Sequence, residues 1–192
     1  MVNNETRILF LFILAVWGLI MLEAYKAPEP ESVTTDMLPQ IPDTPIGTSR
    51  DNPVPLGQSI LCADNFEITA LKTERGQQAL NKITAYNSEN NTPNAGMEYI
   101  LVTLSVKFVE DSSESKRFDL SLFTVVNDNG ILYGKPSLSL SGGLGENFTE
   151  ELSGGAVTEG EIDFQISQSE KNLVLIYTAA VTPHKPCYLS LR

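Results

Sequence analysis

Apolar and polar residues alternate along three stretches of the chain. One stretch carries Ile100, Val102, Leu104, Val106 and Phe108, separated by Leu101, Thr103, Ser105 and Lys107. The same period of two recurs over residues 66–70 and 162–166. This period is typical of a β-strand with one buried face and one outward face. The pattern therefore predicts at least three half-buried strands.

Shorter apolar runs predict further strands. These runs cover residues 59–63, 118–126, 131–133, 137–140, 172–177 and 187–191. Asn127, Asp128, Asn129 and Gly130 lie between two runs and favour the positive backbone angles of a hairpin turn. At most one short helix is expected, over residues 77–83, and the Asn-rich stretch 76–96 is predicted to be the longest mobile loop. Many short strands with few helices predict an antiparallel β-sandwich.

Residues 8–22 contain no charged residue. As a helix this run would be about 22 Å long, which is short for a hydrocarbon core of about 30 Å. Its length also fits the apolar part of a secretory signal peptide, but Leu22 and Ala24 form a poor cleavage site. We therefore expect residues 1–26 to form a single hydrophobic helix that acts as an uncleaved signal anchor. The alternative is a cleaved signal peptide, which would make the protein secreted.

A proline-rich segment follows the apolar run. Seven of the 11 prolines are Pro28, Pro30, Pro39, Pro42, Pro45, Pro53 and Pro55. Proline lacks a backbone donor and favours extended conformations, so residues 27–55 are predicted to be an acidic, semi-rigid linker. The remaining residues, 56–192, are long enough for one domain with its own core.

The predicted domain is acidic. From residue 56 onward it has 10 Lys and Arg against 17 Asp and Glu, and the whole chain has a formal net charge of -11. Nucleic-acid binding depends on neutralising phosphates with cations, so no nucleic-acid partner is expected.

Three segments of the domain resemble a known pattern. They are residues 96–107, 127–133 and 152–164, which include the hairpin turn and the glycines Gly154 and Gly155 before a predicted strand. They are similar to the bacterial telokin-like domain-of-unknown-function family, and the resemblance covers roughly residues 57–178. It implies an immunoglobulin-like sandwich, like that of a secreted mycobacterial antigen, in a secreted or surface-tethered protein. It implies no catalytic residues. The chain departs from the family by lacking a lipid-anchor cysteine before Cys62.

Cys62 and Cys187 are the two cysteines, one in the first predicted strand of the domain and one in the last. Outside the cytoplasm such a pair usually forms a disulfide, which is the expectation here. Two separate buried thiols, or a redox or metal role, are the alternatives.

No catalytic, cofactor or metal site is predicted. His184 is the single histidine, between Pro183 and Pro186, and no Gly-x-Ser-x-Gly motif accompanies it. One histidine and two cysteines are too few for a zinc site. Residues 127–130 lack the ligand spacing of a calcium loop, and the glycine-rich stretches 141–145 and 153–155 are interpreted as turns. We therefore expect a protein that is not an enzyme.

The densest acidic cluster lies on both sides of the second glycine-rich stretch. It comprises Glu146, Glu150, Glu151, Glu159, Glu161 and Asp163. It is interpreted as the solvated face of one sheet, with a cation site or an acid–base pair as the alternative. Asn90 and Asn147 stand in glycosylation sequons, which matter only where the source organism glycosylates them.

The pattern as a whole predicts a membrane-tethered extracytoplasmic domain. The leading hypothesis is protein–protein interaction at the cell surface, or an accessory subunit of a membrane complex, without catalysis. The rival hypothesis is a small-ligand or cation-binding module. The membrane is an expected partner through the N-terminal helix, and the protein partner is unknown.

Overall fold

The structure is a computed structural model in which residues 44–86, 88–89, 92–111, 113–134 and 151–192 are described. All of these residues belong to one compact unit, Pro42–Arg192. The predicted N-terminal helix and most of the predicted linker lie outside the described residues, as does the predicted strand 137–140. Within the described ranges, no helix is both long enough and apolar enough to cross a membrane.

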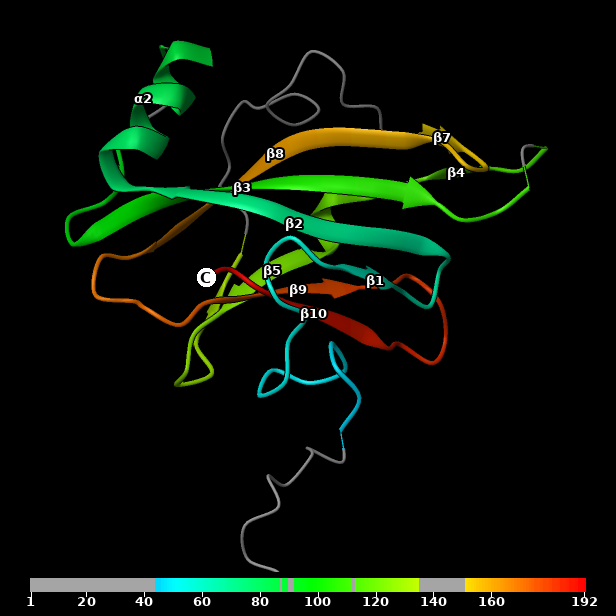
Figure 1. Cartoon of the computed structure of the whole chain (residues 1–192). Helices are drawn as coiled ribbons and strands as arrows, with labels where there is room; N and C mark the ends of the chain where they lie inside the picture. Colours follow the sequence, from blue (N-terminus) through cyan, green and yellow to red (C-terminus); the bar gives the residue numbers. More distant parts are fainter. Residues whose placement is uncertain (1–43, 87, 90–91, 112, 135–150) are drawn as a thin grey trace, which may run out of the picture. The chain divides into compact units, whose positions relative to one another are not determined.

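The unit is built from two antiparallel four-stranded sheets (Figure 1). The first sheet has the order β1 (Ser59–Leu61), β2 (Phe66–Arg75), β3 (Met97–Phe108) and β8 (Val157–Ser167). The second has the order β10 (Pro186–Ser190), β9 (Val174–Thr178), β5 (Phe123–Val126) and β6 (Leu132–Tyr133). A short ribbon pairs β4 (Ser115–Arg117) with β7 (Glu151–Ser153). The predicted all-β sandwich is therefore confirmed.

One hydrophobic core fills the space between the sheets. Alternate residues of β3 and β8 point into it, including Val102, Leu104 and Phe164, all of which are fully buried. Aromatic rings extend the core toward one edge, where Phe118 lies 5.4 Å from the ring of Tyr177 and 5.0 Å from that of Phe66. The predicted period of two in these strands is confirmed, because the inward set buries the apolar side chains.

Helix α2 (Gly76–Tyr86) covers part of the outer face of the first sheet (Figure 1). Ala79 and Ile83 pack against Tyr99 and Leu101, and all four are buried. The short predicted helix is thus confirmed and longer than expected. Leu101 faces away from the main core, as the alternation predicts, but it is not exposed to solvent, because α2 covers it and forms a second small core there.

Residues 44–55 fold against the domain, although the proline content assigns them to the linker. Val54 is buried and pairs in parallel with Leu189 of β10, and its N–H donates to the carbonyl of Tyr188 (2.9 Å). Gly47 accepts from the Tyr188 N–H (2.9 Å), and a side chain at Gly47 would clash with Ile60 and Val54. These contacts cover the outer edge of β10, which would otherwise expose unpaired backbone groups.

The predicted strand 118–126 is only partly a strand. A 3-10 turn, η2 (Leu120–Leu122), precedes β5, and the side chain of Asp119 caps it by accepting from the Ser121 N–H (2.8 Å). Phe118 lies before this turn and is fully buried. The apolar content of the run reflects burial on the core, which a turn can supply as well as a strand.

Candidate functional site

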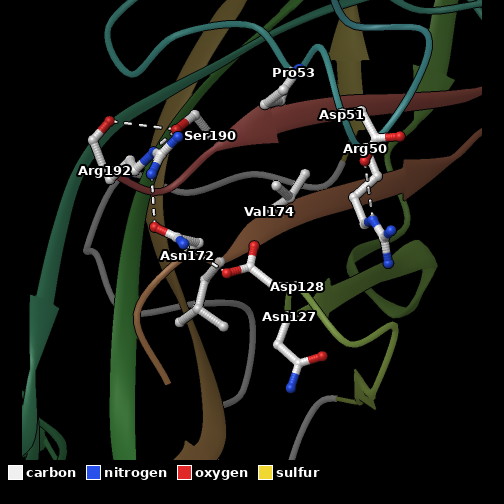
Figure 2. Close-up of a pocket in the computed structure, with 10 residues that line it drawn as sticks. Arg50, Asp51, Pro53, Asn127, Asp128, Asn172, Val174, Ser190 and Arg192 are labelled. Atoms are coloured by element: carbon white, nitrogen blue, oxygen red, sulfur yellow. Dashed lines mark hydrogen bonds and ion pairs between the residues drawn. The ribbon is translucent and has the colours of Figure 1, made fainter. Parts of the chain in front are cut away.

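Loops gather at one end of the second sheet and enclose a pocket of about 230 Å³ (Figure 2). The walls come from the segment before β1, the β5–β6 hairpin loop, the residues before β9 and the end of β10. The lining residues are Arg50, Asp51, Pro53, Asn127, Asp128, Asn172, Leu173, Val174, Ser190 and Arg192. Charged and amide side chains thus surround a partly apolar floor.

Asn127 organises the hairpin loop on one side of the pocket. Its side chain is 1% exposed, and its Oδ1 accepts from the N–H groups of Asn129 (3.0 Å) and Ile131 (2.8 Å). Gly130 has φ +79°, a conformation that favours glycine. The predicted hairpin at residues 127–130 is confirmed, since Val126 pairs with Leu132 across it.

Glu170 joins this hairpin to the neighbouring loop. Its Oε1 accepts from Asn127 Nδ2 (2.9 Å) and from the Tyr133 hydroxyl (2.8 Å), and its backbone carbonyl accepts from Arg75 Nη1 (2.9 Å). Burial, and then the hydrogen bond to the Glu170 carboxylate, raise the pKa of Tyr133. These bonds fix the loop that carries Asn172 into the pocket wall.

A second chain of hydrogen bonds runs along the pocket itself. Arg192 Nη1 donates to Asn172 Oδ1 (2.6 Å), and Asn172 Nδ2 donates to Asp128 Oδ2 (2.5 Å). The amide therefore connects a guanidinium to a carboxylate. This arrangement holds one positive and one negative group in the pocket without direct contact.

Arg50 and Asp51 supply the other two charges. Their Nε and Oδ1 atoms are 3.5 Å apart, and their side chains are 40% and 88% exposed. Arg50 Nη1 lies over the hairpin turn, 3.4 Å from where a side-chain Cβ would stand at Gly130. Such an exposed pair contributes little to folding stability, so the Arg50 side chain is available to other partners.

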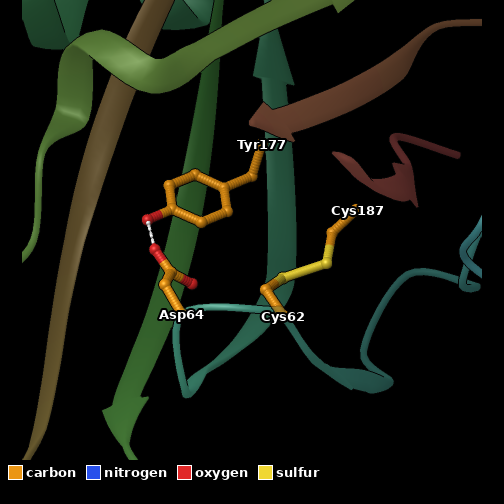
Figure 3. The surroundings of a disulfide bond; sticks show 4 residues. All are labelled: Cys62, Asp64, Tyr177 and Cys187. Atoms are coloured by element: carbon orange, nitrogen blue, oxygen red, sulfur yellow. Dashed lines mark hydrogen bonds between the residues drawn. A yellow bond between two sulfur atoms is a disulfide. The ribbon is translucent and has the colours of Figure 1, made fainter. Parts of the chain in front are cut away.

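The predicted disulfide is confirmed: Cys62 and Cys187 are bonded, with their Cα atoms 6.0 Å apart (Figure 3). Cys62 follows β1 of the first sheet and Cys187 lies in β10 of the second. The bridge thus ties the two sheets together across 125 residues of sequence.

A buried acid lies beside the disulfide (Figure 3). Asp64 is 3% exposed, and its Oδ2 accepts from the Tyr177 hydroxyl (2.6 Å). Its backbone carbonyl accepts from Lys116 Nζ (2.8 Å). Among the described residues, Asp64 Oδ1 has no hydrogen-bond partner. Burial, followed by the hydrogen bond to Asp64, raises the pKa of Tyr177.

The structure separates the members of the predicted acidic cluster. Glu151 and Glu159 are exposed, as a solvated face requires. Glu161 is half-buried and pairs with Lys82 (2.9 Å), whereas Asp163 is only 2% exposed, so its assignment to a solvated face is wrong. Glu146 and Glu150 lie outside the described residues, as do both sequon asparagines, Asn90 and Asn147.

Within the described part of the chain, no group of three or more His, Cys, Asp or Glu is placed to hold a metal ion. His184 is exposed on its loop, with Nδ1 3.1 Å from the carbonyl oxygen of Ala179. His184 is not among the residues that line the pocket of Figure 2.

The pocket was not foreseen from the sequence. The sequence pattern predicts Asp128 only as a turn residue, and Arg50 falls within the predicted linker. Arg192 and Asn172 carry no motif. The one available signal was the polar character of the hairpin turn, because a turn that holds its own backbone leaves Asp128 free to face a neighbouring loop.

Comparison with known proteins places the chain in a family. The family described as a domain of unknown function (DUF4352) matches residues 59–185. The chain belongs to this family. The predicted resemblance to a domain-of-unknown-function family is therefore confirmed, and membership in DUF4352 assigns no activity. Among curated proteins, no significant sequence match was found.

Solved structures with a similar arrangement include three bacterial proteins. The ycdA protein of Bacillus subtilis is 12% identical with a TM-score of 0.49, over 69% of this chain and 37% of that protein. The yjhA protein of the same organism is 12% identical with a TM-score of 0.49, over 72% and 99%. The secreted protein MPT63 of Mycobacterium tuberculosis is 13% identical with a TM-score of 0.45, over 72% and 97%. The chain thus spans little more than a third of ycdA.

Proposed function

We propose that this DUF4352 chain is a non-catalytic domain that works outside the cytoplasm, tethered by its N-terminal apolar run, and binds a protein partner at the cell surface. The observation that carries the location is the Cys62–Cys187 disulfide. Disulfides persist in oxidising compartments and are rare in the cytosol. The acidic composition agrees with a partner other than nucleic acid.

Two features of the domain suit such a partner: a covered sheet edge, and a loop end that side-chain hydrogen bonds hold in place. Residues 47–54 cover the outer edge of β10, which limits uncontrolled pairing with other sheets. The loop end around Asn127 and Glu170 is held by side-chain hydrogen bonds rather than by backbone pairing alone. Binding residues often stand on loops that a rigid scaffold positions, and this end of the sandwich fits that description. An accessory role in a membrane complex is a version of the same proposal.

A cross-linker that cannot enter cells tests location and partner together. Among the described residues, five lysines are exposed, namely Lys72, Lys82, Lys107, Lys171 and Lys185. Intact source cells that express the tagged full-length chain would be treated with a membrane-impermeant amine cross-linker, solubilised in mild detergent and purified by the tag. We expect a discrete cross-linked band that contains the chain and one other protein.

The control is the N-terminal segment without the domain. A tagged chain of residues 1–43, treated and purified in the same way, distinguishes partner capture by the folded domain from capture by the N-terminal segment. A cross-link that forms only after the cells are broken open would contradict the extracytoplasmic location. Recovery of the chain without any cross-linked protein, in several detergents and with cross-linkers of several lengths, would contradict the proposal of a protein partner.

A second candidate function is a small-ligand-binding module, which the pocket of Figure 2 favours. It combines two guanidinium groups and two carboxylates with a floor that includes Leu173 and Val174. Ligand sites typically pair an apolar floor with a few placed polar groups, as this pocket does. Both candidates require no chemical reaction.

A further inference from the structure

We propose that the pocket formed by Arg50, Asp128 and Arg192 binds a small zwitterion of the α-amino-acid type, with its carboxylate on an arginine and its ammonium on Asp128. This inference deepens the second proposed function, ligand binding, and depends on it. The protein-interaction proposal can hold whether or not the pocket binds a ligand.

The charges of the pocket select the class of ligand. The side chains of Arg50 and Arg192 are positive, and those of Asp51 and Asp128 are negative, so the side-chain charges of the lining balance. A dianion such as phosphate would meet both carboxylates, and like charges brought together in a partly enclosed site are unfavourable. A ligand that carries one charge of each sign can instead satisfy an arginine and an aspartate at once.

Arg50 has the freedom to bind a carboxylate. Among the described residues, its one ion-pair partner is Asp51, through Nε at 3.5 Å, and the Asp51 side chain is 88% exposed. Arginine presents a planar fork that matches a carboxylate with two parallel hydrogen bonds. The Nη1 end lies over Gly130, where the missing side chain leaves space beside the hairpin.

Asp128 has the freedom to bind an ammonium group. Its Oδ2 accepts from Asn172, while Oδ1 has no hydrogen bond to another described residue. An ionised carboxylate has about four acceptor positions, so most of its capacity is open. In the view of Figure 2, the Asp128 carboxylate is drawn between the side chains of Arg192 and Arg50.

The size and floor of the pocket agree with a small ligand. Its volume of about 230 Å³ lies below the range of roughly 300–1,000 Å³ that holds drug-sized molecules. Pro53, Leu173 and Val174 supply apolar contacts for a side chain. The hydrogen bonds from Arg192 through Asn172 to Asp128 fix the wall in advance, which reduces the ordering cost of binding.

Calorimetry on the purified, oxidised full-length chain in detergent tests the inference. The chain would be titrated with each of the twenty standard α-amino acids, and with acetate, methylammonium and inorganic phosphate as probes that lack one or both charges. We expect at least one amino acid to bind with one-to-one stoichiometry. Acetate and methylammonium should bind the chain at least tenfold more weakly than that amino acid does.

Matched substitutions assign the binding to the pocket. Arg50→Gln and Asp128→Asn should each weaken binding of the amino acid tenfold or more. Arg117→Gln on β4 and the exposed Asp111→Asn make the same chemical changes elsewhere on the domain and should leave the affinity unchanged. Far-UV circular dichroism and the melting temperature of each variant check that the fold is retained.

Three results would overturn the inference. The first is that no amino acid produces heat or shifts the melting temperature of the chain. The second is phosphate binding as tight as that of any amino acid, which would make this an anion site. The third is an affinity that Arg50→Gln and Asp128→Asn do not change. None of these results bears on cross-linking to a protein partner in intact cells, so the two proposals fail separately.

Discussion

At the scale of single residues, Asp64 is one of two acids that are buried among the described residues. Its carboxylate is 3% exposed and receives one side-chain hydrogen bond, from the hydroxyl of Tyr177. A buried charge that loses its partner is costly, whereas a buried pair of neutral, apolar groups can be as stable as the original pair. Loss of the Asp64–Tyr177 hydrogen bond is therefore expected to cost more stability than the bond itself contributes, because it leaves the buried Asp64 carboxylate without a donor.

A double-mutant cycle tests this expectation. Tyr177→Phe should lower the free energy of unfolding by about 2 kcal/mol at pH 7, because it leaves Asp64 buried without that donor. When Asp64→Asn is already present, the same Tyr177→Phe change should cost about half as much, because no charge is stranded. Urea unfolding of the four proteins measures the coupling. Equal costs in both backgrounds would show that the two side chains act independently.

The same tyrosine predicts how stability changes at alkaline pH. The folded-state pKa of Tyr177 lies above the ordinary value of 10.0, so its contribution is complete below about pH 10 and is lost as the pH rises toward the folded-state pKa. Burial also raises the pKa of Tyr99 and Tyr133. In the same urea series, Tyr177→Phe should flatten, without abolishing, the fall in stability above pH 10.

At the scale of elements, helix α2 is attached to the first sheet by packing and by charge. Lys82 of the helix pairs with Glu74 of β2 and with Glu161 of β8. Hydrogen bonds from Lys72 and then from Lys82 lower the pKa of Glu74. The bonds to Glu74 and then to Glu161 raise the pKa of Lys82. One lysine therefore bridges two carboxylates on β2 and β8, the strands on either side of β3.

The effect of Lys82→Gln on the free energy of unfolding is predicted to depend on pH, which tests this bridge. The Glu74 contribution is complete above about pH 4.5 and is lost as the pH falls through its lowered pKa. The Lys82 side chain is 44% exposed, so we expect a loss of only about 1 kcal/mol at pH 7. The difference from the unchanged chain should shrink toward pH 3. Urea unfolding at both pH values measures it, with Lys185→Gln on an exposed loop as control; a difference that stays constant would contradict the bridge.

The elements also show how far the sequence pattern reaches. The alternation in residues 100–108 and 162–166 predicted the inward faces of β3 and β8, because burial between two sheets follows the strand period. The alternation did not predict that Leu101 and Asp163, which lie on the outward faces, are buried. Leu101 is covered by α2, and no strand pattern records where a helix will pack. The hairpin at residues 127–130 was predictable because its turn chemistry is local.

At the scale of the whole molecule, contacts between distant parts of the chain decide what the pattern could not. The pocket combines Arg50, Asp128 and Arg192, which are separated by more than 60 residues at each step. Residues 44–55 looked like linker because prolines disfavour regular pairing. They nevertheless lie on β10, since Val54 supplies a buried side chain and the backbone bonds that cover the edge. Local propensity carries no information about such long-range contacts.

The disulfide is the strongest of these long-range constraints. It closes a loop across 125 residues and joins the two sheets, so it restricts the unfolded chain as a whole. On the chain-entropy estimate, a loop of this length is worth about 4–5 kcal/mol. Small domains have total stabilities of about 5–15 kcal/mol, so the bridge would supply a large share.

Replacing both cysteines by alanine should therefore leave the domain close to its stability limit. Cys62→Ala/Cys187→Ala should lower the free energy of unfolding by about 4 kcal/mol, measured by urea unfolding without reductant. Reductant should destabilise the unchanged chain by a similar amount and leave the double variant unaffected, which separates the lost bridge from the lost sulfur packing. If the double variant lost less than about 1 kcal/mol, the unfolded chain would already hold its ends together without the bond. The two sheets would then be associated by their core alone.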